Sequence, residues 1–184
     1  MAAKPLKKGA TYDDLRRVPD NYVAEIFDGD LYASRRPAAP HSRAATKLAA
    51  KLDGPFDFEG AGGWILLIET ELHFGNDVLV PDIAGWRRSR MSELPDAPFF
   101  VLAPDWICEV LSASTEATDR GEKMTVYARE RVEHVWLVDP SRQTLEVLAV
   151  EDGRLESLEA YHGNASVRAR PFDTFELELP ALWI

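Results

Sequence analysis

The chain has 184 residues, of which 46% are hydrophobic, and its formal net charge is −10. This length provides one sizeable core but not two ordinary domains, so we expect a single domain over residues 1–184 with a flexible tail at 1–10. The net acidity argues against a protein that simply coats nucleic acid, because such binding depends on lysine and arginine.

The charge is unevenly distributed along the chain. Residues 1–54 carry ten basic and seven acidic side chains, whereas residues 55–184 carry eleven and twenty-four. A polyanion would therefore meet mainly the N-terminal third, through Lys7, Lys8, Arg16, Arg17, Arg35, Arg36, Arg43 and Lys47. Taken alone, each of these residues is equally well interpreted as a solvated surface charge.

The single cysteine, Cys108, lies within an apolar run, so we expect no disulfide framework and a reducing, cytoplasmic environment. No apolar run reaches transmembrane length and no secretion signal is apparent, so we expect no membrane contact. No glycine-rich loop of the Gly-x-Gly-x-x-Gly or Walker type occurs, which leaves a nucleotide cofactor unsupported. Four scattered histidines and one cysteine also argue against a structural zinc site.

The first half of the chain mixes helices and strands. Thr11 predicts the start of a short helix, and residues 22–27 and 31–34 predict a β-hairpin around Asp28-Gly29. Apolar residues at helical spacing predict a helix over 41–52, ended by the segment 53–55. The run 64–69 predicts a buried strand, which residues 70–74 either continue or pair with, and a turn at 75–77 leads into the strand that carries Asp82.

The second half begins with a variable loop at 87–105 and a strand at 106–111. Residues 115–131 predict one helix, and residues 134–139 and 144–150 predict a hairpin. Asp152-Gly153 begins a further hairpin that continues through Tyr161, and residues 172–179 predict a last edge strand. This order indicates an α+β (mixed α/β) fold with a central sheet.

Two carboxylates lie in apolar runs, Asp82 in the segment 78–84 and Glu109 in the segment 106–111. A carboxylate in such a place costs on the order of several kcal/mol unless it is paired or bound to a cation, so the two acids predict a metal site. Asp82 and Glu109 would bind Mg²⁺ or Mn²⁺ for phosphodiester hydrolysis. Lys123 would position or deprotonate the attacking water, or stabilise the pentavalent phosphate. Singly, such acids are more often capped structural groups, and such a lysine is more often an exposed helical residue.

These residues belong to a larger set of motifs. The set comprises Val80-Pro81-Asp82-Ile83, the segment Glu109 to Thr115 with Asp119, Lys123 and Tyr127 after it, and Val135 to Pro140. Upstream stand Glu25-Ile26-x-Asp28-Gly29-x-Leu31 and His41. Taken together, these motifs over residues 22–140 resemble the Uma family of putative restriction endonucleases, a branch of the PD-(D/E)xK nuclease superfamily.

The resemblance implies a restriction-endonuclease-like central sheet flanked by helices, here with additional C-terminal β-hairpins, and metal-dependent DNA cleavage with Asp82 and Glu109 as ligands. Two positions depart from the pattern. The superfamily places its lysine two residues after the second acid, where this chain has Leu111, so Lys123 must enter from the following helix. Arg131 stands where the family tends to have glycine before valine.

Further residues have both a functional and a structural interpretation. Glu25 could be a third acid of the site or a cross-strand charge, and His41 could touch phosphate, hold an acid or cap a helix. Asp119 is either a helix-terminus charge or a partner for Lys123, and Glu71 is a weaker candidate. The tryptophans could stack bases, but their apolar neighbours favour packing in the core or a dimer interface for Trp64, Trp86, Trp106, Trp136 and Trp183.

The sequence thus favours a Mg²⁺-dependent endonuclease acting on DNA. A catalytically weak or inactive binding or assembly protein on the same fold is the alternative, and an enzyme acting on a small phosphate ester is a third. We expect a homodimer, because duplex cleavage needs two sites and the late hairpins offer apolar edges for pairing.

Overall fold

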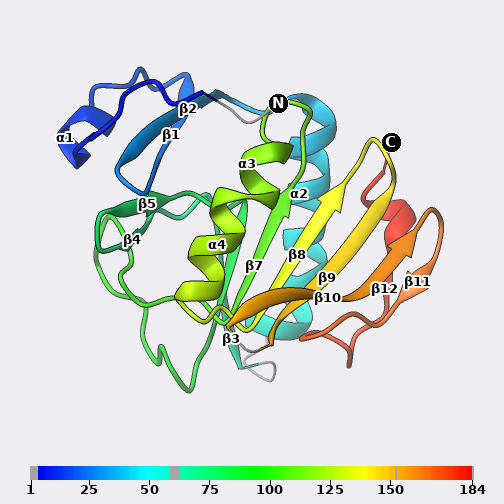
Figure 1. Ribbon diagram of the computed structural model, residues 1–184. Coiled ribbons are helices and arrows are strands. Elements are labelled where there is room, and N and C mark those ends of the chain that lie inside the picture. Colours follow the sequence, from blue (N-terminus) through cyan, green and yellow to red (C-terminus); the bar gives the residue numbers. More distant parts are fainter. Residues whose placement is uncertain (1–3, 59–62, 152, 184) are drawn as a thin grey trace.

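The computed structural model describes residues 4–58, 63–151 and 153–183, which form helices and three sheets (Figure 1). The helices are α1 (Tyr12–Leu15), α2 (Ala39–Asp53), α3 (Glu116–Arg120) and α4 (Glu122–Arg129), with a π-helical turn η1 (Gly54–Phe58) and a 3-10 turn η2 (Leu179–Ala181). The strands are β1 (Tyr22–Phe27), β2 (Asp30–Arg35), β3 (Trp64–Ile68), β4 (Leu72–Phe74), β5 (Asp77–Leu79), β6 (Ile83–Arg87), β7 (Trp106–Val110), β8 (His134–Asp139), β9 (Thr144–Glu151), β10 (Arg154–His162), β11 (Ser166–Val167) and β12 (Leu177–Glu178).

The largest sheet has six strands in the order β10-β9-β8-β7-β6-β3. Its pairings are antiparallel except that of β7 with β8, which run parallel. Parallel neighbours need a crossover connection, and the segment with α3 and α4 supplies it. All five residues of β7 are buried, as expected for a central strand covered on both faces.

Side chains alternate between the two faces of β7. Trp106, Cys108 and Val110 belong to the core cluster that includes α2 residues, whereas Ile107 and Leu111 belong to the cluster that includes α4 residues. Figure 1 shows α2 on one side of the sheet and α3 and α4 on the other. Glu109 has the same parity as Ile107, so it faces α4.

A smaller antiparallel sheet, in the order β2-β1-β5-β4, stands beside the larger one (Figure 1). The predicted hairpin forms β1 and β2, in register from Tyr22 opposite Arg35 to Phe27 opposite Asp30. The segment 70–74 neither continues nor pairs with β3. Only Leu72–Phe74 of this segment form a strand, β4. This strand pairs with β5 across the predicted turn and so belongs to the smaller sheet.

Several element boundaries differ from the predictions. The helix predicted over 115–131 is two helices, because Gly121 breaks it with φ −107° and ψ −94°. The helix expected over 41–52 begins at Ala39, and the chain continues past Gly54 as a π-helical turn. The edge strand predicted at 172–179 is wrong over most of its length, since only β12 pairs there, with β11.

The expected packing of the tryptophans is found, since all five are buried in the core: Trp64, Trp86, Trp106, Trp136 and Trp183. Within the described residues, the exposed large hydrophobic side chains are Leu6, Tyr12, Ile68, Leu94 and Val101. None of these five side chains belongs to the described residues of β8, β9 or β10.

Some predictions fall at the edges of the described ranges. In the predicted tail 1–10, the Leu6 N–H donates to the Leu31 carbonyl at 2.7 Å, while residues 1–3 lie outside the described residues. Asp152 of the predicted Asp152-Gly153 turn lies outside them as well, and β10 follows it as predicted. No helix in the described ranges is long and apolar enough to cross a membrane.

Candidate active site

A small recess lies where β1, β7, the β5–β6 connection and the helices meet. Its volume is about 50 Å³, and its lining includes the residues singled out in the sequence: Glu25, His41, Asp82, Glu109, Asp119 and Lys123. The structure therefore brings together residues that span almost a hundred positions of the chain. Of the acids considered earlier, Glu71 lies elsewhere, where it holds Tyr12 and His73.

Lys123 reaches Glu109 from α4. Its Nζ lies 3.1 Å from both carboxylate oxygens of Glu109. One turn later on the same helix face, the Tyr127 hydroxyl donates to Glu109 Oε1 at 2.5 Å. Tyr127 belongs to the motif set of the sequence, and its spacing of four from Lys123 places both side chains on one face of α4.

Two further carboxylates surround the same ammonium. Glu25 Oε1 of β1 lies 3.0 Å from Lys123 Nζ, and Asp119 Oδ1 of α3 lies 3.3 Å from it. The Val80 N–H also donates to Glu25 Oε1 at 2.8 Å, which fixes this carboxylate against the segment before Asp82. An ammonium has three N–H groups, so the carboxylates of Glu109, Glu25 and Asp119 match its donors.

Asp82 lies just before β6 and is held on one side only. Its Oδ2 accepts the Val110 N–H at 2.7 Å and lies 3.2 Å from His41 Nε2. The ladder between β6 and β7 runs from Gly85 to Ile83, and the Asp82 side chain extends it by one contact. Among the described residues no hydrogen bond or ion pair involves Oδ1 of Asp82, so this oxygen remains available to a ligand.

Burial and mutual repulsion shift the acidities in the recess. Burial raises the pKa of Glu109 well above its ordinary value, and although Lys123 offsets part of this, nearby acids add to it. Burial also raises the pKa values of Glu25 and Asp119, again opposed by the ammonium. Burial alone would lower the pKa of Lys123, but the surrounding carboxylates raise it well above its ordinary value. Lys123 is therefore an ammonium at neutral pH.

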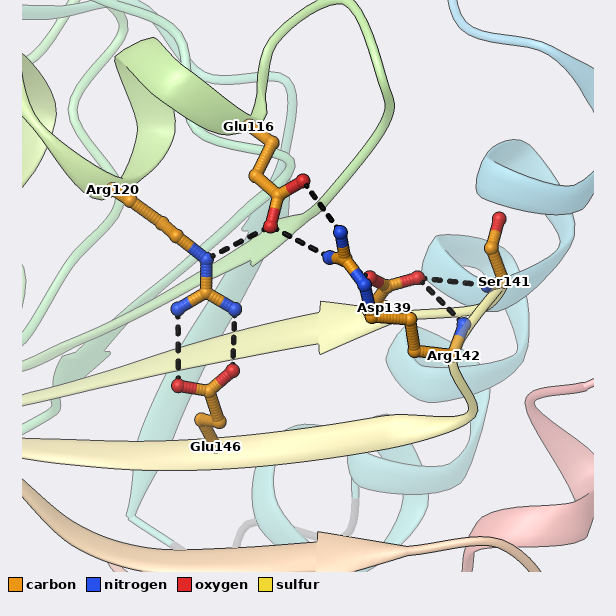
Figure 2. Close-up of polar contacts among 6 residues, drawn as sticks. All are labelled: Glu116, Arg120, Asp139, Ser141, Arg142 and Glu146. Atoms are coloured by element: carbon orange, nitrogen blue, oxygen red, sulfur yellow. Dashed lines mark hydrogen bonds and ion pairs between the residues drawn. The ribbon is translucent and has the colours of Figure 1, made fainter.

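Ion pairs on the outer side of α3 tie this helix to the β8–β9 hairpin (Figure 2). Arg142 donates to both oxygens of Glu116, at 2.6 and 3.2 Å, and Arg120 pairs with both oxygens of Glu146. Arg120 also donates to Glu116 at 3.2 Å. A helix of only five residues is not stable by itself, so α3 depends on these contacts and on its packing. The same contacts keep Asp119 facing the recess.

Leu111 stands two residues after Glu109, where the nuclease pattern that the sequence resembles places a lysine. It is 3% exposed and belongs to the same buried cluster as Val126 and Tyr127 of α4. The residue at this position therefore packs in the core that supports the helix bearing Lys123.

A comparison of the sequence with models of known protein families finds a match that includes all of these residues. The family model Uma2, described as "Putative restriction endonuclease", matches residues 10–181. The chain belongs to this family. The Uma2 resemblance expected from the sequence motifs is thereby confirmed, and it extends beyond residues 22–140 on both sides.

Among solved structures, a putative nuclease of DUF820 from Anabaena variabilis ATCC 29413 is 23% identical in sequence. The alignment covers 94% of this chain and 97% of that chain, with a TM-score of 0.77. At this identity the likeness shows the fold, and it confirms the predicted α+β class with a large central mixed sheet. Nothing among the curated proteins matches the chain.

The donor set fits a hard divalent cation better than a structural metal. No three His, Cys, Asp or Glu side chains within residues 4–58, 63–151 and 153–183 form a ready-made metal cage. Mg²⁺ is usually held by one or two carboxylates and keeps several waters, so a complete cage is not required. The acids that line the recess, Glu25, Glu69, Asp82, Glu109 and Asp119, outnumber its basic side chains, Arg35, His41 and Lys123. A divalent cation would offset this excess of negative charge.

Proposed function

We propose that the protein is a metal-dependent endonuclease that hydrolyses phosphodiester bonds in DNA. Asp82 and Glu109 would hold the cation, Mg²⁺ or Mn²⁺, and Lys123 would complete the catalytic set. The observation that carries the proposal is the 3.1 Å approach of Lys123 Nζ to both oxygens of Glu109, in the recess that Asp82 also lines. Membership of the Uma2 family supports the same conclusion.

The cation supplies Lewis-acid chemistry and a bound water of lowered pKa when it is present. Side chains of the protein would hold and orient the groups that bind the cation. Asp82 offers its Oδ1, while its Oδ2 stays fixed by the Val110 N–H. Tyr127 orients the carboxylate of Glu109 through the hydrogen bond to Oε1.

Lys123 contributes positive charge rather than a base. Its pKa is raised well above the ordinary value, so the amine carries no free lone pair at neutral pH and would not accept a proton from water. A fixed ammonium close to the scissile phosphate would stabilise the negative charge that grows on phosphorus oxygens. Of the roles that the sequence left open for Lys123, transition-state stabilisation fits this geometry best.

Duplex cleavage needs two sites, and we therefore propose that the protein acts as a homodimer. DNA would approach over the N-terminal third, where Arg35 lines the recess. Some of the basic residues there are already paired, since Lys7 lies 2.7 Å from Asp14 and Arg36 lies 3.0 Å from Glu69. We also propose that the protein acts in the cytoplasm, because a reducing compartment suits the buried free thiol of Cys108.

Cleavage of supercoiled plasmid with and without Mg²⁺ tests the function. Asp82→Asn, Glu109→Gln and Lys123→Met are expected to abolish metal-dependent nicking, and EDTA is expected to abolish it in the wild type. Glu71→Gln, outside the recess, serves as the matched control and is expected to cleave normally. Asp82→Asn is preferred to alanine because the amide oxygen can still accept the Val110 N–H.

Calorimetric titration with Mg²⁺ separates the proposal from its rivals. Metal binding without cleavage of DNA would overturn the nuclease proposal in favour of a binding or assembly protein on the same fold. Metal-dependent hydrolysis of a small phosphate ester, with plasmid left intact, would favour the third hypothesis.

A further inference from the structure

We propose that the pocket beside the recess is a subsite for one nucleotide of the DNA strand, adjacent to the scissile phosphate. This inference rests on the proposed function and names where the substrate's next residue binds. The pocket has a volume of about 380 Å³, against about 50 Å³ for the recess. The two share Glu25, Ser34, Arg35, Thr115 and Asp119 among their lining residues, so they form one continuous groove.

The recess and the pocket differ in volume, so they can hold different parts of a nucleotide. The recess admits only a few atoms, such as phosphate oxygens and water. The pocket falls within the range of volumes that small-molecule sites have. A strand whose phosphate enters the recess must place its neighbouring sugar and base somewhere, and this pocket is the adjoining space.

The strand register puts an aromatic wall in the pocket. Tyr32 of β2 lies directly opposite Glu25 of β1, so both side chains point to the same face of the hairpin. The Tyr32 ring packs on Phe27, with centroids 5.4 Å apart, which leaves it half-buried and fixed in place. Its hydroxyl has no hydrogen-bond partner among the described residues. A fixed aromatic face with a free hydroxyl suits a nucleobase, which can stack and hydrogen-bond.

Arg35 lies where the pocket meets the recess. It ends β2 and is exposed, and no ion pair within the described part of the chain involves it. Its neighbour Arg36, by contrast, is bound to Glu69 at 3.0 Å. An unpaired guanidinium that lines both spaces is placed for the phosphate between two nucleotides. Lys4 lines the pocket too and adds positive charge, whereas Ser34, on the Tyr32 face, adds a hydroxyl.

The acids of the groove restrict how a nucleotide enters. Glu25 and Asp119 line both spaces and would repel a phosphate placed against them. The phosphate is therefore expected on the side of Arg35, and the base on the side of Tyr32. The ligand class that fits is a nucleoside with a flanking phosphate, and not a free inorganic anion.

Binding of a fluorescent nucleotide tests the subsite without requiring cleavage. The probes are 2-aminopurine deoxyriboside 5′-monophosphate and a short single-stranded oligonucleotide that carries one 2-aminopurine, titrated in the absence of Mg²⁺. Stacking on Tyr32 is expected to quench the fluorescence of both. The oligonucleotide should bind more tightly, because its further phosphates meet the basic N-terminal third.

Paired variants separate the aromatic and the charge contributions. Tyr32→Leu, which still fills the space against Phe27, should weaken binding about tenfold, whereas Tyr32→Phe keeps the ring and should bind within about twofold of the wild type. Arg35→Ala should weaken binding about tenfold, while Arg36→Ala is the matched control and should change it little. Thermal unfolding of each variant verifies that the fold is intact.

The outcomes distinguish the subsite from the nuclease function. Mononucleotide binding that is absent in the wild type, or unchanged in folded Tyr32→Leu and Arg35→Ala proteins, overturns the subsite, even if plasmid is still cleaved. Binding that depends on both residues supports the subsite, even if no cleavage is found. A mononucleotide that binds as tightly as the oligonucleotide would overturn the assignment to a DNA strand.

Discussion

Replacing Lys123 by methionine is expected to destabilise the protein strongly at pH 8. Lys123 is 4% exposed, and its ammonium lies 3.0, 3.1 and 3.3 Å from carboxylate oxygens of Glu25, Glu109 and Asp119. At an effective dielectric constant of about 20, each such contact is an attraction of about 5 kcal/mol. Desolvation of the ammonium offsets much of this attraction. Removing one partner of a buried ion pair typically lowers the free energy of unfolding by about 3–5 kcal/mol, and we expect a loss in that range.

The loss should depend on pH with a defined sign. Without the ammonium, the pKa values of the three acids rise further above their ordinary values, so the folded state takes up protons more readily than the unfolded state. Stability of the variant should therefore recover as pH falls from 8 toward 5, relative to the wild type. A double variant, Lys123→Met with Glu109→Gln, should regain part of the loss already at pH 8, because one buried charge is gone.

Urea unfolding followed by tryptophan fluorescence at pH 5 and pH 8 measures these differences. Lys51→Met is the matched control, since Lys51 makes an exposed contact of 3.6 Å with Glu178 and should cost less than about 1 kcal/mol. A Lys123→Met protein within about 1 kcal/mol of the wild type at pH 8 would refute the reasoning, and so would a loss that is the same at both pH values.

Three further predictions concern single positions. Glu109→Gln should lower the free energy of unfolding at pH 8 by less than Lys123→Met does, because Glu25 and Asp119 still pair with the ammonium and one buried charge is removed. Urea unfolding at pH 8 measures both variants, and a larger loss in the Glu109→Gln protein would contradict the reasoning. Arg131→Gly should stabilise the protein by up to about 1 kcal/mol, because Arg131 has a φ of 60° on an exposed turn, and an unchanged or lowered melting temperature would contradict this. Gly85→Ala should cost about 1–3 kcal/mol, because a Cβ would lie 2.9 Å from Leu66 Cδ2 and 3.1 Å from Trp106, and normal stability in chemical denaturation would count against it.

Much of the fold was predictable because its signals are local. The Asp28-Gly29 turn and the alternation around it fix the register of β1 and β2, and the apolar run at 106–111 marks a strand buried on both faces. The break at Gly121 was missed, since a helical pattern runs through it and only tertiary packing separates α3 from α4. The short strand β12 was overestimated because Phe172 and Phe175 are apolar for packing in the core and not for strand pairing.

The site was predictable in part for a different reason. Asp82 and Glu109 stand out because acids are rare inside apolar runs. Glu25 and Asp119 were candidates only: the spacing of four offered Asp119 as a partner for Lys123, but nothing in the sequence reveals that Glu25 contacts the same ammonium. Arg35 was one of eight equivalent basic residues in the sequence, and the structure distinguishes it from Arg36 by the groove that it lines and by the ion pair of Arg36 with Glu69.

The packing of Leu111 makes the position of the lysine hard to reverse. A lysine introduced there would bury an ammonium in the cluster that holds Val126 and Tyr127, and so weaken the seat of the helix that carries Lys123. A single Leu111→Lys substitution would therefore not transfer the role proposed for Lys123 to the end of β7, because the buried ammonium would disturb the packing that positions α4.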